Sequence, residues 1–283
     1  MLLDARPYVK EKIMELKERV NKLNKQPKLV IIRVGNDFAS GKYVANKVKR
    51  CEEVGIKSEI VHLDENVTNG EVLKKIMMLN NDRDVTGILL QLPLPEHLNE
   101  EYLTNAIDPE KDVDGFTIAN MGRLALGIEG NVACTPRGII SLLKYYNVEL
   151  QGKNVLIINR SNIVGKPLAH LLLRENATVT VAHSKTKDLY DQVLAADIVV
   201  TAIGKAEHFD THDFSKDTTI VDVSINFNEE GKMCGDVRKS HYDTLIEELN
   251  CNVTPVPNGV GQMTVIELIE QTIEIAERTN NGN

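Results

Sequence analysis

Residues 153–173, KNVLIINRSNIVGKPLAHLLL, decide how the second half of this chain is expected to fold. The run 155–158 is continuously apolar, which is typical of a strand buried on both faces of a parallel sheet. A polar turn follows, and Gly165 and Pro167 then open a helix, since proline is tolerated in a first helical turn. Free N–H groups and the positive dipole end at such a helix start can bind a phosphate. The stretch therefore predicts a strand, turn and helix that could hold a dinucleotide.

The turn in this stretch departs from the full G-x-G-x-x-G pattern of dinucleotide sites. Asn159 and Ser161 stand at the first two glycine positions, although asparagine accepts left-handed backbone angles better than most residues. On its own, the pattern is equally typical of a buried strand–helix unit that binds no ligand.

Length and composition limit the possible classes of protein. The chain has 283 residues, which suits about two domains, and its net charge of −8 argues against a nucleic-acid or anionic-membrane surface. Its four cysteines lie far apart without a C-x-x-C pair, so neither a zinc site nor a disulfide framework is expected. No segment resembles a signal peptide or approaches the roughly 20 apolar residues of a membrane span. These features predict a cytoplasmic protein that binds neither nucleic acid nor membrane.

Strand and helix patterns alternate through both halves of the chain. Strands are predicted at 28–34, 56–63, 87–90, 155–158, 178–182, 198–202 and 219–223, and helices at 9–23, 39–54, 69–79, 135–146 and 189–195. Regular pattern fades between residues 93 and 132, where a domain boundary is expected. Thr264 and Glu267 form a capping-box pattern that predicts the start of a last helix. The alternation indicates two α/β domains, the second a Rossmann-type doubly wound parallel sheet.

Three polar residues of the first half are candidates for chemistry. Tyr43 and Lys47 lie four residues apart on one face of the predicted helix 39–54, and Gln91 directly follows the strand 87–90. The ends of parallel strands are where ligands bind in open α/β sheets, which favours a site role for Gln91. Lys47 has two interpretations: a solvated surface lysine, which composition favours, or a partly desolvated lysine that exchanges protons beside a tyrosine.

Two acidic or histidine-containing segments could suggest a metal. Asp112 and Asp114 lack the further ligands of a calcium loop, and a carboxylate that hydrogen-bonds the N–H groups of a heterocycle is an equal alternative. His208 and His212 have Asp210 nearby but no third strong ligand in place, which favours a solvated loop. No metal is expected.

The segment after strand 178–182 bears on cofactor choice. Many dinucleotide enzymes carry an acid there that holds a ribose hydroxyl, whereas this chain has His183, Ser184, Lys185 and Thr186. The missing acid, together with Arg160 in the first turn, favours a 2′-phosphate and hence NADP, with NAD still possible.

Several blocks together resemble the bifunctional methylenetetrahydrofolate dehydrogenase/methenyltetrahydrofolate cyclohydrolase family along nearly the whole chain. The matching blocks are VGNDFASGKYVANKVK (34–49), GILLQLPLP (87–95), PEKDVDGF (109–116), CTPRGI (134–139), RSNIVGKPLA (160–169), HSKT (183–186) and TPVPNGVGQMT (254–264). Seven blocks in the right order are far more specific than the dinucleotide turn alone.

The resemblance implies a fold and an assembly. Two α/β domains would flank a cleft, with the last helix returning to the N-terminal domain, and a homodimer would form through the cofactor domains. The folate-binding catalytic domain would comprise residues 1–119 and 262–283, and the NAD(P)-binding domain residues 120–261. The protein would serve one-carbon metabolism and, through it, purine biosynthesis.

The resemblance also implies a role for each site residue. Lys47 would be the catalytic lysine, Tyr43 would stack on the folate, Gln91 would hydrogen-bond Lys47, and Asp114 would bind the pterin ring. Pro257, Gly259 and Gly261 would complete the substrate site. The cofactor would contact Asn159, Arg160, Ser161, Gly165, His183, Ser184, Lys185, Thr186 and Ile225. The reactions would be NADP-dependent oxidation of methylenetetrahydrofolate to methenyltetrahydrofolate and hydrolysis of the latter to 10-formyltetrahydrofolate.

The chain departs from the family pattern mainly on its cofactor side. The family usually has glycine where Asn159, Ser224 and Asn258 stand, and proline where Gln262 stands. Added side chains could obstruct a cofactor, so one alternative is a monofunctional methenyltetrahydrofolate cyclohydrolase with an impaired cofactor site. A second is another two-domain NAD(P)-dependent dehydrogenase acting on a small acid, and a third is a non-enzymatic nucleotide-binding protein.

Overall fold

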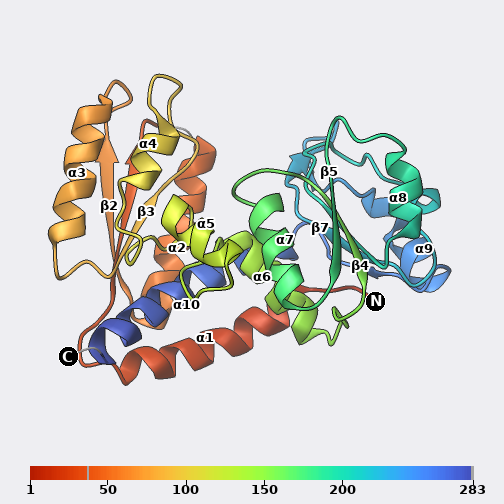
Figure 1. Cartoon of the computed structure of the whole chain (residues 1–283), viewed down its shortest axis with the longest axis horizontal. Helices are drawn as coiled ribbons and strands as arrows, with labels where there is room; N and C mark the ends of the chain where they lie inside the picture. The colour runs from red at the N-terminus through yellow and green to blue at the C-terminus, as the bar shows by residue number, and fades with distance from the viewer. Residues whose placement is uncertain (37, 282–283) are drawn as a thin grey trace. The chain divides into compact units, whose positions relative to one another are not determined.

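The computed structural model describes residues 1–36 and 38–281, and it divides into two compact units (Figure 1). One unit comprises Lys10–Val132 and the chain from Val265 on, and contains a three-stranded sheet. The other comprises Met1–Val9 and Ala133–Thr264, and contains a five-stranded sheet. We call them the three-stranded and the five-stranded unit. These are structural divisions; the predicted folate-binding and cofactor-binding limits concern ligands and stay a prediction.

The three-stranded unit is built on a parallel sheet in the order β2-β1-β3. The central strand is buried because its run LVIIRV is almost wholly apolar, so that helices can cover both faces. Its strands are β1 (Lys28–Val34), β2 (Lys57–Leu63) and β3 (Gly87–Leu90). Its helices are α2 (Phe38–Val54), α3 (Asn69–Asn81), α4 (Glu100–Asn105), α5 (Ile118–Ala125) and most of α1 (Ala5–Asn21) and α10 (Val260–Asn281). The strands predicted here are confirmed to within one residue.

The five-stranded unit has the strand order β10-β7-β6-β4-β5, all parallel. The strands are β4 (Asn154–Ile158), β5 (Thr178–Ala182), β6 (Ile198–Thr201), β7 (Thr219–Asp222) and β10 (Asn252–Val253), and a hairpin pairs β8 (Asn226–Phe227) with β9 (Met233–Cys234). The helices are α6 (Cys134–Tyr145), α7 (Gly165–Arg174), α8 (Leu189–Ala195) and α9 (Tyr242–Glu247), with short 3-10 turns at η1 (Thr211–Asp213) and η2 (Lys239–His241).

Strand β4 shows why its apolar run specifies this sheet. Val155 and Ile157 belong to one hydrophobic cluster, whereas Leu156 and Ile158 belong to a second. Because successive side chains of a strand point to opposite faces, the two clusters cover the two faces of the sheet. The prediction of a doubly covered, Rossmann-type sheet is confirmed.

The stretch 93–132, where the sequence shows no regular pattern, contains α4 and α5, whose N-caps are Asn99 and Thr117; the helices are too short to show a periodic pattern. Two predicted helix starts were wrong. Helix α1 begins at Ala5 rather than at residue 9. At this start, the Asp4 carboxylate accepts the N–H of Arg6 at 2.9 Å.

Helix α10 also begins earlier than predicted, at Val260 rather than Thr264. The Thr264 hydroxyl donates to the carbonyl of Val260 at 3.5 Å, one turn back, as threonine does inside a helix. The capping-box pattern at Thr264 and Glu267 was therefore a coincidence of spacing.

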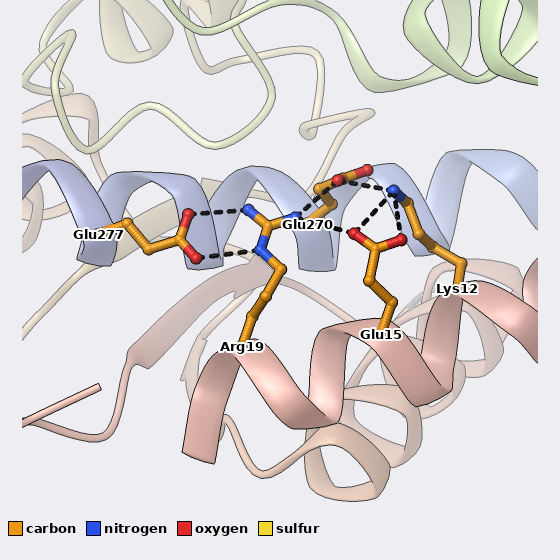
Figure 2. A network of polar contacts seen from close by, with 5 residues as sticks. All are labelled: Lys12, Glu15, Arg19, Glu270 and Glu277. Atoms are coloured by element: carbon orange, nitrogen blue, oxygen red, sulfur yellow. Dashed lines mark hydrogen bonds and ion pairs between the residues drawn. The ribbon is translucent and has the colours of Figure 1, made fainter. Parts of the chain in front are cut away.

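Ion pairs join α1 to α10 in the three-stranded unit (Figure 2). Arg19 binds both carboxylate oxygens of Glu277, at 3.0 and 2.8 Å, and one oxygen of Glu270 at 2.8 Å. Lys12 reaches the same Glu270 oxygen at 2.9 Å. The hydrogen bonds from Arg19 to Glu277 raise the pKa of the guanidinium, and the pair is partly buried, so this network holds the two helices together.

Within the described parts of the chain, no helix is both long and apolar enough to span a bilayer.

Candidate active site

Lys47 and Gln91 form a hydrogen-bonded pair in the three-stranded unit. Gln91 continues the ladder after β3, with its N–H donating to the carbonyl of Ile32 at 2.9 Å. Its side-chain amide donates to the carbonyl of Leu92 at 2.7 Å, which leaves Oε1 to accept from Lys47 Nζ at 3.1 Å. Lys47 is only 9% exposed, so of its two interpretations the structure favours the desolvated lysine over the surface one.

Tyr43 lies one helical turn before Lys47 on α2 and keeps 42% of its surface exposed. Partial burial raises the pKa of its hydroxyl, which keeps the phenol neutral. An aromatic ring that is half-exposed on the same helix face as a buried amine offers a platform for a planar ligand. Asp37, in the same sequence block, lies outside the described residues.

The segment 111–117 brings Asp114 beside the end of β3. Ile88 donates its N–H to the carbonyl of Lys111 at 2.8 Å, and Asp112 forms a parallel bridge with Ile88. Gly87 permits this approach, because a Cβ there would lie 2.2 Å from a methyl of Val113. Asp114 and Leu90 line one small cavity of about 10 Å³, so Asp114 lies close to the strand that leads into Gln91.

The two aspartates of this segment differ in use. Asp112 is 2% exposed, and its carboxylate accepts the N–H of Thr117 and the side-chain amide of Asn120, both at 2.9 Å. It therefore shapes the loop and is not available to a ligand. Asp114, in contrast, is half-buried.

The turn after β4 is organised by the side chain of Asn159. Its carboxamide oxygen accepts the N–H groups of Ser161 at 2.8 Å and Gly165 at 3.1 Å, and its amide donates to the carbonyl of Ala202 at 2.7 Å. Gly165 must be glycine, since a Cβ would lie 2.1 Å from the carbonyl oxygen of Asn159. Asparagine thus replaces the first glycine of the motif with side-chain hydrogen bonds that close the same turn.

A second turn lies beside the first at the same edge of the sheet. Ile158 pairs with Ala182 in the parallel register, so the residues that follow these strands are neighbours. In the second turn, the N–H of His183 donates to Thr186 Oγ1 at 2.8 Å and that of Lys185 donates to His183 Nδ1 at 3.1 Å. The structure therefore brings the predicted cofactor residues of both turns together, with Arg160, Ser184 and Lys185 exposed.

The predicted substrate residues near α10 lie in the five-stranded unit. Gly259 sits where a Cβ would meet the carbonyl oxygen of Pro255 at 2.5 Å, and a Cβ on Gly261 would lie 3.6 Å from Ile225. Asn258 adopts φ +82°, a left-handed angle that explains why glycine suits this position and why asparagine is a workable replacement. The bond before Pro257 is cis.

Two buried carboxylates at the carboxyl edge of the five-stranded sheet were not predicted from the sequence. Asp222 ends β7 and is 1% exposed, and Asp236 follows β9 and is 0% exposed. Burial raises the pKa of Asp222 to about 7. The only signal in the sequence was an acid at the end of a buried strand, as at Asp222, or an acid directly after a glycine, as at Asp236.

The histidine segment forms a hydrogen-bonded turn. Asp210 and Asp213 form a capping box on η1, and the side chain of His212 is 79% exposed. Within residues 1–36 and 38–281, no three His, Cys, Asp or Glu side chains converge as metal ligands would.

Comparison with known proteins matches both units. A family model described as the tetrahydrofolate dehydrogenase/cyclohydrolase catalytic domain matches residues 3–114, and one described as the NAD(P)-binding domain of the same family matches residues 133–280. The chain belongs to the tetrahydrofolate dehydrogenase/cyclohydrolase family. The resemblance seen in the sequence blocks is thereby confirmed.

Individual members of the family agree over the full length. The bifunctional protein FolD of Agathobacter rectalis is 48% identical over 93% of this chain and 94% of its own. The crystal structure of the bifunctional FolD enzyme from Campylobacter jejuni is 42% identical, covers 99% of both chains and superposes with a TM-score of 0.94. The FolD structure from Trypanosoma brucei, complexed with NADP cofactor and inhibitor, is 32% identical over 99% of this chain and 98% of its own, with a TM-score of 0.90.

Proposed function

We propose that this chain oxidises methylenetetrahydrofolate with NADP and hydrolyses the resulting methenyltetrahydrofolate to 10-formyltetrahydrofolate. The observation that carries the proposal is the hydrogen bond of 3.1 Å between the buried amine of Lys47 and Gln91, inside a domain that matches the family's catalytic model. Full-length relatives named as bifunctional FolD proteins support both activities.

Lys47 is suited to the hydrolysis. In its unprotonated form, the amine can take a proton from the water that adds to the cationic methenyl carbon, and the ammonium can then return a proton to the departing ring nitrogen. Gln91 Oε1 accepts from Nζ and has its own amide tied to Leu92, so it directs the amine without competing as a base. We assign Tyr43 to stacking on the substrate and Asp114 to its heterocycle N–H groups.

The residues at the edge of the five-stranded sheet fit a dinucleotide. The N-terminus of α7, with no Cβ at Gly165, the half-buried Ser161 and the exposed side chains of Arg160, Ser184 and Lys185 would hold phosphates. The turn 183–186 contains no acid to repel a 2′-phosphate, which supports NADP over NAD. When bound, NADP accepts the hydride from the methylene carbon of the folate.

Further assignments belong to the same proposal. Residues 1–119 with 262–283 would bind folate and residues 120–261 the cofactor. A homodimer through the cofactor domain is supported by β5, which is one edge strand of its sheet and leaves Val181 38% exposed, and by Leu173 on α7, which is 56% exposed. A cytoplasmic location fits four cysteines that are all buried and form no disulfide. The family supports a role in one-carbon metabolism and, through it, purine biosynthesis.

The test is a paired assay on one preparation of the wild type. Oxidation of methylenetetrahydrofolate is measured with NADP⁺ and with NAD⁺, and hydrolysis of methenyltetrahydrofolate is measured without cofactor. Both reactions are expected, with the larger kcat/KM for NADP⁺. Hydrolysis alone would favour the monofunctional cyclohydrolase, and the absence of both reactions would refute the proposal.

A further inference from the structure

Asp236 is the most heavily hydrogen-bonded side chain at the carboxyl edge of the five-stranded sheet. Although 0% exposed, its carboxylate accepts five hydrogen bonds. The donors are Thr201 Oγ1 at 2.8 Å, the N–H of Ile203 at 2.8 Å, the N–H of Lys205 at 2.9 Å, Ser224 Oγ at 2.7 Å and Asn226 Nδ2 at 3.1 Å. A buried carboxylate with this many donors needs no cation to compensate for its lost water.

These donors come from two segments that leave the sheet side by side. Thr201 ends β6 and Asp222 ends β7, and the register pairs the two residues. Residues 203–205 and 224–226 therefore follow neighbouring strands, at the same edge as the Asn159 turn, because β4 pairs with β6. Asp236 holds both loops at the edge where the cofactor is assigned.

Ser224 adds a link that a glycine at this position could not provide. Its hydroxyl accepts the N–H of Gly204 at 3.1 Å and donates to Asp236 Oδ2 at 2.7 Å. The serine thus connects the first loop, the second loop and the buried carboxylate in one chain of hydrogen bonds. Its side chain is directed into the protein, so it does not obstruct a cofactor at this edge.

Asp222 supports the backbone on which Asp236 stands. Its carboxylate accepts the N–H groups of Val237 at 2.8 Å and Ser224 at 3.2 Å. It also fills the space beside Gly235, where a Cβ would lie 2.0 Å from Oδ2. Asp222 therefore fixes the backbone on both sides of Asp236, whereas Gly204, Lys205 and Ile225, on the loops that Asp236 holds, remain exposed.

We propose that Asp236 and Ser224 are positioning residues for the dinucleotide: they hold residues 203–205 and 224–226 in the conformation that binds NADP. The inference rests on the proposed function, since it takes NADP as the ligand of this edge. The buried anchor and the exposed loops indicate that the network shapes a surface rather than filling the core. Its loss lowers the fraction of molecules with a competent site, and the apparent Kd rises in inverse proportion to that fraction.

The experiment compares wild type, Asp236→Asn and Ser224→Ala, with Asp243→Asn as the matched control. Asp243 is an exposed aspartate of the same unit, on α9. Each full-length protein is assayed for NADP⁺ Kd by titration, for KM and kcat of the oxidation, and for cofactor-independent hydrolysis. In Asp236→Asn, the side-chain NH₂ group replaces an accepting oxygen and faces N–H or O–H donors, so hydrogen bonds to the two loops are lost. We expect the Kd and KM for NADP⁺ to rise about tenfold. Ser224→Ala should raise them about threefold, and neither variant should change hydrolysis more than about twofold.

Three outcomes decide the matter. If wild type fails to bind or use NADP⁺, the proposed function fails and this inference falls with it. If wild type binds NADP⁺ and Ser224→Ala and a folded Asp236→Asn bind it equally well, the positioning role alone is wrong. If Asp236→Asn does not fold, the NADP⁺ affinity of Ser224→Ala alone decides. In either variant, a loss of hydrolysis equal to the loss of NADP⁺ affinity would also contradict the inference, since it would indicate that the whole fold is disturbed.

Discussion

Replacing Gly165 by alanine probes the turn on which the cofactor assignment depends. An alanine Cβ would lie 2.1 Å from the carbonyl oxygen of Asn159 and 2.9 Å from the N–H nitrogen of Arg160. Ordinary van der Waals contact begins at 3.4 Å, so the backbone of the turn must retreat by about 1.3 Å. Such overpacking costs about 1–3 kcal/mol of stability.

The same displacement moves the groups that would bind a phosphate. The Asn159 carboxamide closes the turn through Ser161 and Gly165, so shifting the helix start from the turn breaks or lengthens these bonds. We expect Gly165→Ala to lower the free energy of unfolding by about 2 kcal/mol and to weaken NADP⁺ binding at least about tenfold. Urea unfolding and NADP⁺ titration measure the two effects on one preparation.

Gly122→Ala is the matched control. Gly122 also lies in a helix, and a Cβ there meets nothing within 4 Å. Alanine should stabilise that helix by up to about 1 kcal/mol and leave NADP⁺ affinity unchanged. If Gly165→Ala behaved like Gly122→Ala in both measurements, the close packing of α7 on the turn would not constrain residue 165.

Three further predictions concern stability. Burial raises the pKa of Asp222 to about 7, so the folded protein binds this proton more tightly than the unfolded chain does. The free energy of unfolding should therefore fall as pH rises from 4 to 7, by at most about 1.4 kcal/mol per pH unit. Urea unfolding at several pH values measures the slope, and an Asp222→Asn protein with the wild-type slope would contradict this prediction. Lys111 donates to three carbonyls at the C-terminal end of α3 at 2.6 to 3.0 Å, so Lys111→Met should lower the free energy of unfolding by about 2 kcal/mol. Urea unfolding measures the loss, and a loss no greater than that of the exposed control Lys74→Met would contradict a capping role for Lys111. Arg19→Met leaves Glu277 without its bidentate partner and should lower the free energy of unfolding by about 2 kcal/mol. Thermal unfolding at low and high salt measures this loss, and an unchanged melting temperature would show that the ion pairs between α1 and α10 do not stabilise the protein.

The central strands could be predicted because each is an apolar run bounded by turn residues. The runs 28–34 and 87–90 match β1 and β3 to the residue, since burial on both faces leaves little choice of side chain. The run 178–182 also matches β5, an edge strand in which threonine and valine alternate. Helix ends were less accessible. Thr264 has the spacing of a capping box, but α10 begins at Val260.

The candidate site divides in the same way. Gln91 was singled out because ligands bind at strand ends, and its bond to Lys47, 44 residues away, follows from the sheet. Asp236 was missed because its donors come from residues 201–226, and only the folded chain brings them together. Asn159 and Ser224 were taken from sequence as possible obstructions, whereas their side chains make the hydrogen bonds that organise the loops.

The amine of Lys47 is the group to which we assign the hydrolysis. The most direct test supplies methylenetetrahydrofolate and NADP⁺ to wild type, Lys47→Met and Lys49→Met, and measures the ratio of 10-formyl to methenyl product against an enzyme-free blank. Lys49 is exposed on the same helix, so its loss should leave the ratio as in wild type.

Loss of a general acid–base group typically lowers a rate by about 10² to 10⁴. Lys47→Met should therefore accumulate methenyltetrahydrofolate, with its enzymatic hydrolysis reduced at least about 100-fold. A Lys47→Met protein that forms 10-formyltetrahydrofolate at the wild-type ratio and rate would contradict this assignment.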